Sequence, residues 1–552
     1  MAEINKLQIA FIHPDLGIGG AERLVVDAAL GLQNKGHSVS IITSHHDPTH
    51  CFDETRDGTL RVVLYKPPFF LPRSIHGKLH ILLAHLRQLH LTWHLLRADG
   101  TPDVFVVDQL STCIPMLRLF ASKRVVFYCH FPDKLLATGE AIEEDGDSPP
   151  KPLHNNAGLL KRLYRLPMDL LEEYTTASAD IILVNSLFTS RIFKRHFPSI
   201  KLDKDGKNLS GGQRGSQGGP RVIYPGINLA AYEVAASKDE PREVTLLRSD
   251  RPTFISLNRF EAKKNVALAL KAFALFIQHI GRSSKPSHIQ ARLVIAGGYD
   301  SRVRDNVDTL NALLRTACEL GLSWCLFPVT NEGKGAPFIP DDISPQSSLE
   351  TAQVVFLPNF TTAQRSLLLT SENTLALLYT PTGEHFGIVP VEAMACGLPV
   401  LACRSGGPKE SVVDDEPRNS VDLADWSVVD SSSAETSSST RTGWLRSPSP
   451  EAWAEALAAI AMLSPSARSA LSLRAKNRAR DMFSLDAMSA GMERAIRDAY
   501  SLGPVTRRRL LGPEAATWIY ICLVAVSIFT LGATYTIVWT AVVLGGTTLL
   551  GF

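Results

Sequence analysis

The chain has 552 residues, more than one compact core usually holds, so its length predicts two or three domains. The 57 basic and 55 acidic residues leave a formal net charge of +2, which argues against a nucleic-acid-binding protein that relies on a basic surface. Eight cysteines without a CxxC pair, and no apolar leader before the first strand-like run, predict reduced thiols in the cytosol.

The start of the chain has the pattern of a βαβ unit. The strand-like run LQIAFIH leads into the loop PDLGIGG, then into a helical pattern over 21–35 and a second strand-like run, SVSIIT. Gly19 and Gly20 stand where the helix begins, so the backbone there can approach a phosphate or sugar closely. The GxGxxG dinucleotide pattern is incomplete, because position 22 is Glu.

A basic amphipathic helix is predicted over residues 78–97. Its leucines and Trp93 recur at three-to-four-residue spacing, while lysine, arginine and four histidines occupy the rest of the helix. This pattern fits a helix that covers a sheet, and it equally fits a helix that lies on a membrane surface. The preceding PPFFLPR favours contact with lipid or with a lipid-bearing substrate.

Apolar, β-branched runs at 103–108, 124–130 and 180–185 continue the pattern of a parallel sheet. His130 closes the second of these runs. The end of a parallel strand is where a side chain is delivered into a ligand site, so we predict a functional role for this histidine.

A glycine-rich polar stretch, GKNLSGGQRGSQGGPR, follows and interrupts the alternation of strands and helices, so a domain boundary is predicted near residue 225. The acidic insert at 139–152 contains Asp145-Gly146-Asp147, which resembles a metal-binding DxD sequence. Because it lies in a low-complexity loop and not at a strand end, no metal site is predicted there.

The alternation restarts at TFISLNR, with further strand-like runs at 291–298, 352–358, 375–381 and 399–405. The sequence therefore predicts an α/β fold with two tandem, doubly wound domains, residues 1–225 and 226–500. Ligands are expected beyond the carboxyl ends of the strands, in a cleft between the two domains.

The C-terminal end has a different character, because no charged residue occurs from Ala515 to Phe552. Such a run is long enough for one transmembrane helix or for a tight pair of short ones. Arg507, Arg508 and Arg509 precede it, and the positive-inside rule places a cluster of this kind on the cytosolic face. We therefore predict a membrane anchor over 505–552 and a soluble body that faces the cytosol.

Two glutamates, Glu384 and Glu392, flank a glycine in an otherwise apolar stretch, PTGEHFGIVPVEAMACGLPV. The pattern predicts a strand that ends at about residue 381, a loop that contains Glu384, and a helix whose first turn contains Pro390 and Glu392.

The backbone N–H groups of Gly387, Ile388 and Val389 would then lie at the N-terminus of this helix, where they can hold a diphosphate. Glu392 could accept the hydroxyls of a ribose, and Glu384 those of a sugar. Compensation of the helix dipole would also explain an acid at position 392, and a solvated loop would explain one at 384.

Two cations, Arg259 and Lys264, follow the first strand of the second domain in the sequence NRFEAKKN. Cations at this end of a strand can neutralise the charge that develops on a leaving diphosphate as a glycosyl bond breaks. Taken alone, either residue would also fit an ordinary surface position.

Together these motifs form a recognisable set: E-x7-E, the following SGGPKE, GIGGAE near the start, Gly-His at 36–37, and an arginine five residues before a lysine. The set resembles the retaining glycosyltransferases of family 4, which have the two-Rossmann GT-B fold, over about residues 6–500. Within that family the segments YCHFPD and SLNRFEAKKN look most like the mannosyltransferases of the dolichol pathway that add the second and third mannoses.

The resemblance implies that the donor is GDP-mannose, bound mainly by the second domain. The implied contacts are Glu392 on the ribose, Glu384 on the mannose, Arg259 and Lys264 on the diphosphate, the N–H groups of Gly387, Ile388 and Val389 beside it, His130 near the transferred sugar, and Gly19 and Gly20 near the donor phosphate. The implied acceptor is dolichyl-diphosphate chitobiose with one mannose, extended in α-1,3 and then α-1,6 linkage at the cytosolic face of the endoplasmic reticulum membrane. No metal or other cofactor is expected, and other enzymes of the pathway are possible partners.

Several alternatives stay open at this stage. The two glutamates could be the acid and nucleophile of a retaining glycosidase, although the intervening helix start favours a diphosphate. A Rossmann oxidoreductase would need an acidic ribose partner after the second strand, where only Asp47 is available. A transferase that uses a UDP-sugar, or a membrane-anchored scaffold with an inert sugar-nucleotide site, would also fit the motifs.

Overall fold

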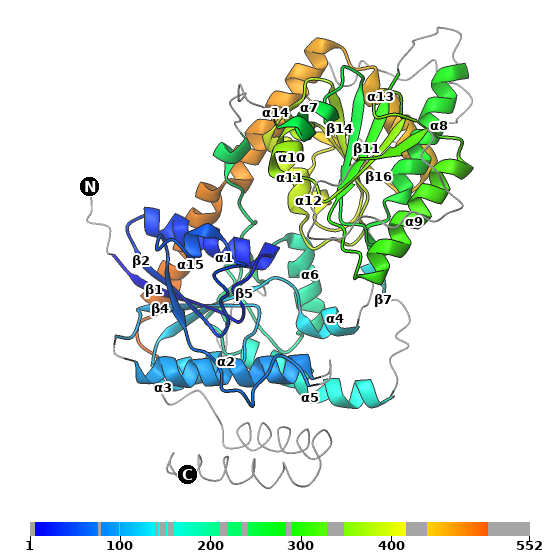
Figure 1. The fold of residues 1–552 in the computed structure, drawn as a ribbon. Coiled ribbons are helices and arrows are strands. Elements are labelled where there is room, and N and C mark those ends of the chain that lie inside the picture. The colour runs from blue at the N-terminus through cyan, green and yellow to red at the C-terminus, as the bar shows by residue number, and fades with distance from the viewer. Residues whose placement is uncertain are drawn as a thin grey trace. The chain divides into compact units, whose positions relative to one another are not determined.

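The computed structural model describes residues 6–75, 79–98, 100–138, 142–143, 151–152, 159–208, 218–232, 241–282, 290–327, 347–415 and 439–505. The apolar run at 515–552 and the Asp145-Gly146-Asp147 sequence lie outside these residues. The described chain forms two compact units that divide between Tyr224 and Pro225, and Figure 1 shows the elements of each.

The first unit is built on a seven-stranded, all-parallel sheet with the order β3-β2-β1-β4-β5-β8-β9. Its strands are β1 (Gln8–His13), β2 (Ser38–Thr43), β3 (Arg61–Leu64), β4 (Val104–Asp108), β5 (Arg124–Cys129), β8 (Ile181–Val184) and β9 (Arg221–Val222). Its helices are α1 (Gly20–Asn34), α2 (His80–Arg97), α3 (Ile114–Phe120), α4 (Asp133–Thr138), α5 (Leu159–Thr176), α6 (Leu187–His196) and most of α15 (Leu485–Ser501), with the short helix η1 (Asp53–Thr55).

The second unit has the same architecture, with the strand order β12-β13-β11-β10-β14-β15-β16, again all parallel. Its strands are β10 (Thr253–Leu257), β11 (Arg292–Gly297), β12 (Trp324–Leu326), β13 (Val354–Pro358), β14 (Thr374–Tyr379), β15 (Val400–Cys403) and β16 (Gly443–Arg446). Its helices are α7 (Arg242–Leu247), α8 (Ala267–Arg282), α9 (Arg304–Glu319), α10 (Thr362–Thr370), α11 (Ile388–Ala395), α12 (Pro408–Ser411), α13 (Pro450–Ala461) and α14 (Pro465–Phe483), with the short helices η2 (Leu229–Tyr232) and η3 (Ala262–Lys264). A separate pair, β6 (Ile142–Glu143) and β7 (Lys151–Pro152), forms a two-stranded sheet.

The buried strands explain why their sequences are runs of apolar residues without alternation. Helices cover a parallel sheet on both faces, so the residues on both sides of each strand are buried. All five residues of β4, VFVVD, are buried, and so are all six of β14, TLALLY. The core of the second unit joins the strands of its own sheet to α8, α9 and α13, with Trp324 and Trp453 among its fully buried side chains.

Both sheets have a point at which the strand order reverses direction. In the first unit, successive strands extend one way from β1 and the other way from β4; in the second, the same happens between β10 and β14. Ligands of doubly wound folds bind at the carboxyl ends of the strands flanking such a switch point. The two switch points are therefore the places to look for function.

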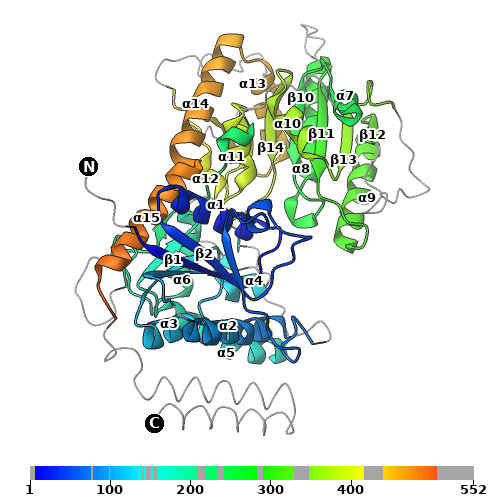
Figure 2. The ribbon, with the colours of Figure 1, turned by 60° about the vertical axis from the view of Figure 1, so that its left-hand side comes forward.

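Helix α2 covers the first sheet, as one of the two interpretations of residues 78–97 predicted. Leu91 and Leu95 belong to the core beneath it. The buried face also carries polar residues, because His85 contacts the Thr112 hydroxyl at 2.5 Å and Gln88 donates to the Leu110 carbonyl at 2.6 Å. The predicted apolar stripe was wrong in part: Trp93 of that stripe is 45 % exposed. Figure 2 shows α2 beside α3 and α5.

The C-terminal part of the second predicted domain differs from expectation. We predicted that residues 226–500 belong to one domain, but residues 488–505 pack with the first unit. Helix α15 makes this connection, because Glu493 contacts His37 at 3.3 Å and Asp498 contacts Arg221 at 2.7 Å.

Within the described ranges no single helix is long and apolar enough to span a bilayer, and only α13 with α14, bent by 111° at their junction, reach that length and composition together.

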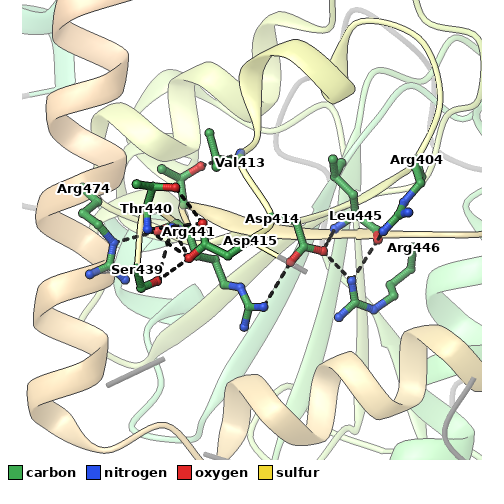
Figure 3. A network of polar contacts seen from close by, with 11 residues as sticks. Arg404, Val413, Asp414, Asp415, Ser439, Thr440, Arg441, Leu445, Arg446 and Arg474 are labelled. Carbon is green, nitrogen blue, oxygen red and sulfur yellow. Dashed lines mark hydrogen bonds and ion pairs between the residues drawn. The ribbon is translucent and has the colours of Figure 1, made fainter. Parts of the chain in front are cut away.

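A polar network joins the end of α12 to β16 in the second unit (Figure 3). The buried Asp414 carboxylate contacts Arg441 at 3.2 Å and Arg446 at 2.5 Å, and it accepts the Leu445 backbone N–H at 3.0 Å. The neighbouring Asp415 accepts the backbone N–H of Arg441 at 3.0 Å. These contacts fix the last strand of the sheet to the chain that follows β15.

Candidate active site

The strongest candidate site lies at the switch point of the second sheet, where Lys264 and Glu384 meet. Lys264 follows β10 in helix η3, and Glu384 follows β14. The Lys264 ammonium lies 2.7 Å from a Glu384 carboxylate oxygen. The Thr380 hydroxyl donates to the Lys264 carbonyl at 2.6 Å, so the end of β14 also fixes the lysine backbone. The structure thus brings together two residues that the sequence predicted for one site.

The Glu384 carboxyl group is held in its ionised form. Burial alone would raise its pKa, but the charge and hydrogen bond of Lys264 outweigh burial, with help from His385 and the Tyr379 hydroxyl, and lower it. The ammonium group has three N–H donors and gives one to Glu384. No second hydrogen bond of this ammonium group occurs among the described residues, so its remaining donors can serve an anion such as a diphosphate.

The SGG sequence after β15 holds the loop that carries Glu384. Gly407 N–H donates to the Glu384 carbonyl at 2.8 Å, and Gly383 N–H donates to the Ser405 hydroxyl at 2.9 Å. Gly406 has φ of +62°, and a Cβ atom there would lie 2.4 Å from the Glu384 carbonyl oxygen. Only glycine combines this backbone conformation with so close an approach. The motif therefore holds the backbone of the loop that carries Glu384.

Helix α11 begins at the predicted place. Gly387 is its N-cap residue with φ of +80°, and no side chain caps the helix. The first N–H groups of a helix have no partner within it, so the N–H groups of Ile388 and Val389 point out of this end. A Cβ atom on Gly387 would lie 3.1 Å from the Tyr379 hydroxyl, so the glycine lets the helix start close to this buried ring.

Glu392 lies one turn further along than predicted. We placed it in the first turn of the helix, but α11 runs from Ile388 to Ala395, so Glu392 is the fifth residue and lies in the second turn. Its carboxylate is mostly buried and already has partners. The Tyr232 hydroxyl donates to Oε1 at 2.7 Å, and Arg365 contacts the same oxygen at 3.2 Å. Arg365 also lies 5.6 Å from the centre of the Tyr232 ring.

Arg259 is less constrained than the other predicted residues of this site. Its side chain is 72 % exposed, and it forms an ion pair with Glu261 at 3.7 Å. Its position after β10 agrees with the prediction, but the structure does not join it to the Lys264–Glu384 pair.

In the first unit, His130 is part of a buried charged group at the switch point of that sheet. His130 Nε2 lies 2.8 Å from one oxygen of Asp108, and His13 Nδ1 lies 2.7 Å from the other. His13 and Asp108 end β1 and β4, and His130 follows β5. Asn185 donates to the His130 carbonyl at 3.0 Å, so both the ring and the backbone of His130 are held.

The charges of this group reinforce one another. Burial alone would lower the pKa of His13, but the hydrogen bonds and charges of Asp108 and Glu22 raise it to about 9. Burial likewise opposes ionisation of Asp108, yet His130 and His13 lower its pKa to about 2. His130 Nε2 therefore faces a carboxylate, and the 21 % exposed His130 side chain is the member of the group that can reach a ligand.

The glycine loop connects to the same group through Glu22. Gly19 is the N-cap residue of α1, which begins at Gly20, as predicted. Glu22 Oε1 lies 3.9 Å from His13 Nε2, and a Cβ atom on Gly19 would lie 2.2 Å from the other Glu22 oxygen. The loop therefore packs directly against the charged side chain of Glu22, the last residue of the GIGGAE motif, whose contact with His13 the motif did not predict.

Sequence reasoning missed several residues that hold the predicted ones: His13, Asp108, Tyr232, Arg365 and Tyr379. The first two stand at strand ends, which was a usable signal, but Tyr232 and Arg365 approach Glu392 only through the tertiary fold. No group of three or more His, Cys, Asp or Glu side chains suited to a metal ion occurs among the residues that the structure describes. The absence of a metal requirement stays a prediction.

Comparison with known proteins places the two units in glycosyltransferase families. Residues 18–203 match the family model Glycosyltransferase Family 4, and residues 347–478 match Glycosyl transferases group 1. The chain is therefore a glycosyltransferase.

More specific relatives are α-1,3/1,6-mannosyltransferases named ALG2. The protein from Rhizomucor pusillus is 45 % identical over 75 % of this chain and 80 % of its own length. The protein from Kluyveromyces lactis is 38 % identical over 96 % of this chain and 95 % of its own length. The chain belongs to the ALG2 family of α-1,3/1,6-mannosyltransferases.

Solved structures support the fold. Sucrose-phosphate synthase from Thermosynechococcus elongatus has a TM-score of 0.57 at 16 % identity, covering 90 % of this chain and all of that chain. A UDP-forming α,α-trehalose-phosphate synthase from Burkholderia xenovorans has a TM-score of 0.58 at 13 % identity, covering 89 % of this chain and 99 % of that one. The predicted class of two Rossmann-like domains with the GT-B fold is confirmed.

Proposed function

We propose that this enzyme transfers mannose from GDP-mannose, with retention, to dolichyl-diphosphate chitobiose bearing one mannose, first in α-1,3 and then in α-1,6 linkage. The relatives support the transferred sugar and the linkages. The observation that carries the proposal is the Lys264–Glu384 pair, 2.7 Å apart at a sheet switch point and close in sequence to the uncapped N-terminus of α11.

Each residue has a physical role in this proposal. Lys264, with Arg259 recruited from the surface, would balance the charge on the diphosphate, and the N–H groups at the start of α11 would donate to its oxygens. The Glu384 carboxylate would accept hydroxyls of the mannose, and Glu392 those of the ribose. Tyr232 and Arg365 both contact Oε1 of Glu392, and within the described part of the chain no hydrogen bond to Oε2 is found, so Oε2 could accept a ribose hydroxyl.

The first unit would contribute His130 and the glycine loop. His130, held at Nε2 by Asp108, would donate or accept at Nδ1 toward the transferred sugar. The N–H groups of Gly19 and Gly20 would approach the donor phosphate without steric hindrance from a side chain.

The reaction needs no protein nucleophile in this proposal. The bond between mannose C1 and the diphosphate oxygen breaks as the acceptor hydroxyl oxygen bonds to C1 on the same face. The hydroxyl proton passes to the leaving diphosphate. Lys264 stabilises the negative charge that grows on that diphosphate, which lowers the barrier because this charge is larger in the transition state than in the bound donor. We propose that neither a metal ion nor another cofactor is required.

We also propose that the enzyme acts at the cytosolic face of the endoplasmic reticulum membrane, anchored through residues 505–552. Membership of the ALG2 family and the uncharged run from Ala515 support this placement. Protease protection of intact microsomes tests it: a tag before residue 6 should be digested without detergent.

The function is tested by incubating the full-length protein with a synthetic mono-mannosyl chitobiosyl diphosphate lipid and radiolabelled GDP-mannose, with UDP-N-acetylglucosamine in parallel and with EDTA as a further arm. Two additions from GDP-mannose, unaffected by EDTA and cleavable by linkage-specific α-mannosidases, are the expected result. Transfer from the UDP-sugar would overturn the donor assignment. No transfer from either donor, with GDP still bound, would favour an inert scaffold.

A further inference from the structure

In the first unit, one arginine pairs with a carboxylate near the carboxyl end of β1, and the charges of both act on a second arginine. Asp15 follows that strand by two residues, and Arg73 forms an ion pair with its Oδ2 atom. The other oxygen, Oδ1, is buried and has no hydrogen-bond partner among the described residues; His45 Nε2 lies 4.0 Å from it. This edge of the sheet is the one that also carries the glycine loop and His13.

Arg87 supplies the second cation. It lies on α2, and its Nε atom is buried without a hydrogen-bond partner in the described part of the chain. Burial and then the nearby charge of Arg73 lower the pKa of its guanidinium, while Asp15 acts in the opposite direction. Two guanidinium groups thus lie near one carboxylate, which leaves positive charge and unused N–H donors at the site.

The support beneath Arg87 is rigid. The next residue, Gln88, donates to the Leu110 carbonyl at 2.6 Å, and His85 contacts the Thr112 hydroxyl at 2.5 Å. Both partners belong to the loop after β4, close in sequence to Asp108. An arginine on such a support is positioned before any ligand arrives, so less conformational entropy is lost on binding.

An exposed apolar segment directly precedes Arg73 in the sequence. The chain leading into it is held against α2 at Tyr65, which stacks on His94 with ring centres 5.9 Å apart. Within this segment Phe69 is 95 % exposed and Phe70 is 64 % exposed, with their rings edge to face. Large apolar side chains left this exposed at a cationic site suit a ligand that joins an anion to an apolar chain.

We propose that Arg73 and Arg87 bind the diphosphate of the lipid-linked acceptor and that Phe69 and Phe70 contact its apolar chain. Two guanidinium forks match the several oxygens of a diphosphate, because each fork can donate two parallel hydrogen bonds. The inference rests on the proposed function, and it adds the residues that hold the acceptor, which none of the glycosyltransferase motifs supplies.

Two kinds of molecule carry a phosphate group next to an apolar chain: the acceptor and the anionic lipids of the bilayer. The test therefore measures mannose transfer by full-length wild type, Arg73→Gln, Arg87→Gln and Arg87→Lys in neutral detergent micelles, and again in vesicles containing phosphatidylinositol. Arg56→Gln is the matched control: its side chain is 52 % exposed and paired with Asp53, as that of Arg73 is 55 % exposed and paired with Asp15. Initial rates are taken with acceptor and GDP-mannose varied in turn, and thermal unfolding identifies any misfolded variant.

In micelles we expect both glutamine variants to raise the acceptor KM at least about tenfold. Arg87→Lys should recover part of that loss, and Arg56→Gln should match wild type. The KM for GDP-mannose should be unchanged throughout. An effect confined to anionic vesicles would mean that the arginines bind lipid headgroups, and it would overturn the acceptor site. An unchanged acceptor KM in all variants would also overturn the acceptor site. If wild type itself transfers no mannose, the proposed function is wrong. If wild type transfers mannose and the variants have the same acceptor KM, only the assignment of the two arginines is wrong.

Discussion

The Lys264 ammonium lies 2.7 Å from the Glu384 carboxylate, although 120 residues separate the two in sequence. The doubly wound topology explains this contact, since β10 and β14 are neighbours that carry the two residues at their carboxyl ends. A cation and an acid held in this way can serve different parts of one ligand.

Replacing Lys264 by methionine should lower kcat for mannose transfer at least about 100-fold, because a cation that stabilises the leaving diphosphate is lost. Glu384→Gln should also lower kcat. The double variant should lose much less than the product of the two single effects, since the residues interact directly. Initial-rate measurements at saturating substrates check this. Fully multiplicative losses would show that the pair does not act as a unit.

The His13–Asp108 contact predicts a pH-dependent contribution to stability. The pKa of folded His13 is raised to about 9, above the ordinary 6.5, so its stabilising effect is complete below pH 6.5 and is lost as the pH rises through 9. The shift corresponds to about 3 kcal/mol. Urea unfolding of wild type and His13→Gln at pH 6, 7.5 and 9.5 should show a difference that shrinks with rising pH. A constant difference would contradict the assignment.

Glu392 should discriminate donors by their ribose. If it accepts ribose hydroxyls, GDP should compete with GDP-mannose at least about tenfold more strongly than 2′,3′-dideoxy-GDP in wild type. In Glu392→Gln the two inhibitors should differ much less. Tyr232→Phe removes one donor to the same carboxylate and should preserve the discrimination. Equal inhibition of wild type by both nucleotides would rule out the ribose role.

Gly406 tests the support of the Glu384 loop. Alanine there meets a positive φ and a carbonyl oxygen 2.4 Å from its Cβ atom, so both strain and a clash are expected. Gly321→Ala is the control, because Gly321 also has a positive φ, +66°, but nothing within 4 Å of a Cβ atom. Each variant should lose about 1–2 kcal/mol of stability from the backbone alone. Only Gly406→Ala should also lose most of its transfer activity; equal activities would mean the loop tolerates displacement.

Asp414 should be important for stability and not for chemistry. Its carboxylate is buried between Arg441 and Arg446, so Asp414→Ala leaves two cations without their partner (Figure 3). The free energy of unfolding should fall by about 3 kcal/mol. Denaturant titration measures this loss, while the KM values of the folded fraction should match wild type. A change in donor KM without a loss of stability would contradict the structural role.

The sequence predicted the architecture and the central pair well, because the relevant signals are local. Buried parallel strands are apolar runs, and a helix that begins after a strand can bind an anion at its N-terminus. Both patterns can be recognised from neighbouring residues, without knowledge of the rest of the fold. Lys264 and Glu384 each follow such a strand, so their meeting followed from topology. The partners of Glu392 were not predictable in this way, since Tyr232 and Arg365 lie in two helices, η2 and α10, and meet Glu392 only through the tertiary fold. Glu392 itself lies in the second turn of α11 and not in the first, because the first residue of a helix is predicted from sequence only to within one or two residues.

The buried side of α2 was mispredicted in part for a related reason, although Leu82 and Leu83 of the predicted stripe are buried. Periodicity marks the most apolar stripe, but His85 and Gln88 are buried because they find hydrogen-bond partners in the loop after β4. A polar residue with a satisfied hydrogen bond is compatible with a core, and that satisfaction depends on another segment of the chain. Arg87 was visible in the sequence as one of several basic residues, whereas its approach to Arg73 and Asp15 required the fold.

The division of the chain matters for anyone who wishes to dissect it. Because residues 488–505 return to the first unit, that unit is not a continuous segment. A fragment that ends near Tyr224 lacks the glutamate that contacts His37 and the aspartate that contacts Arg221. Chimeras that exchange donor specificity between relatives should therefore replace 225–487 as an internal cassette, with two junctions, and keep the C-terminal helix of the recipient.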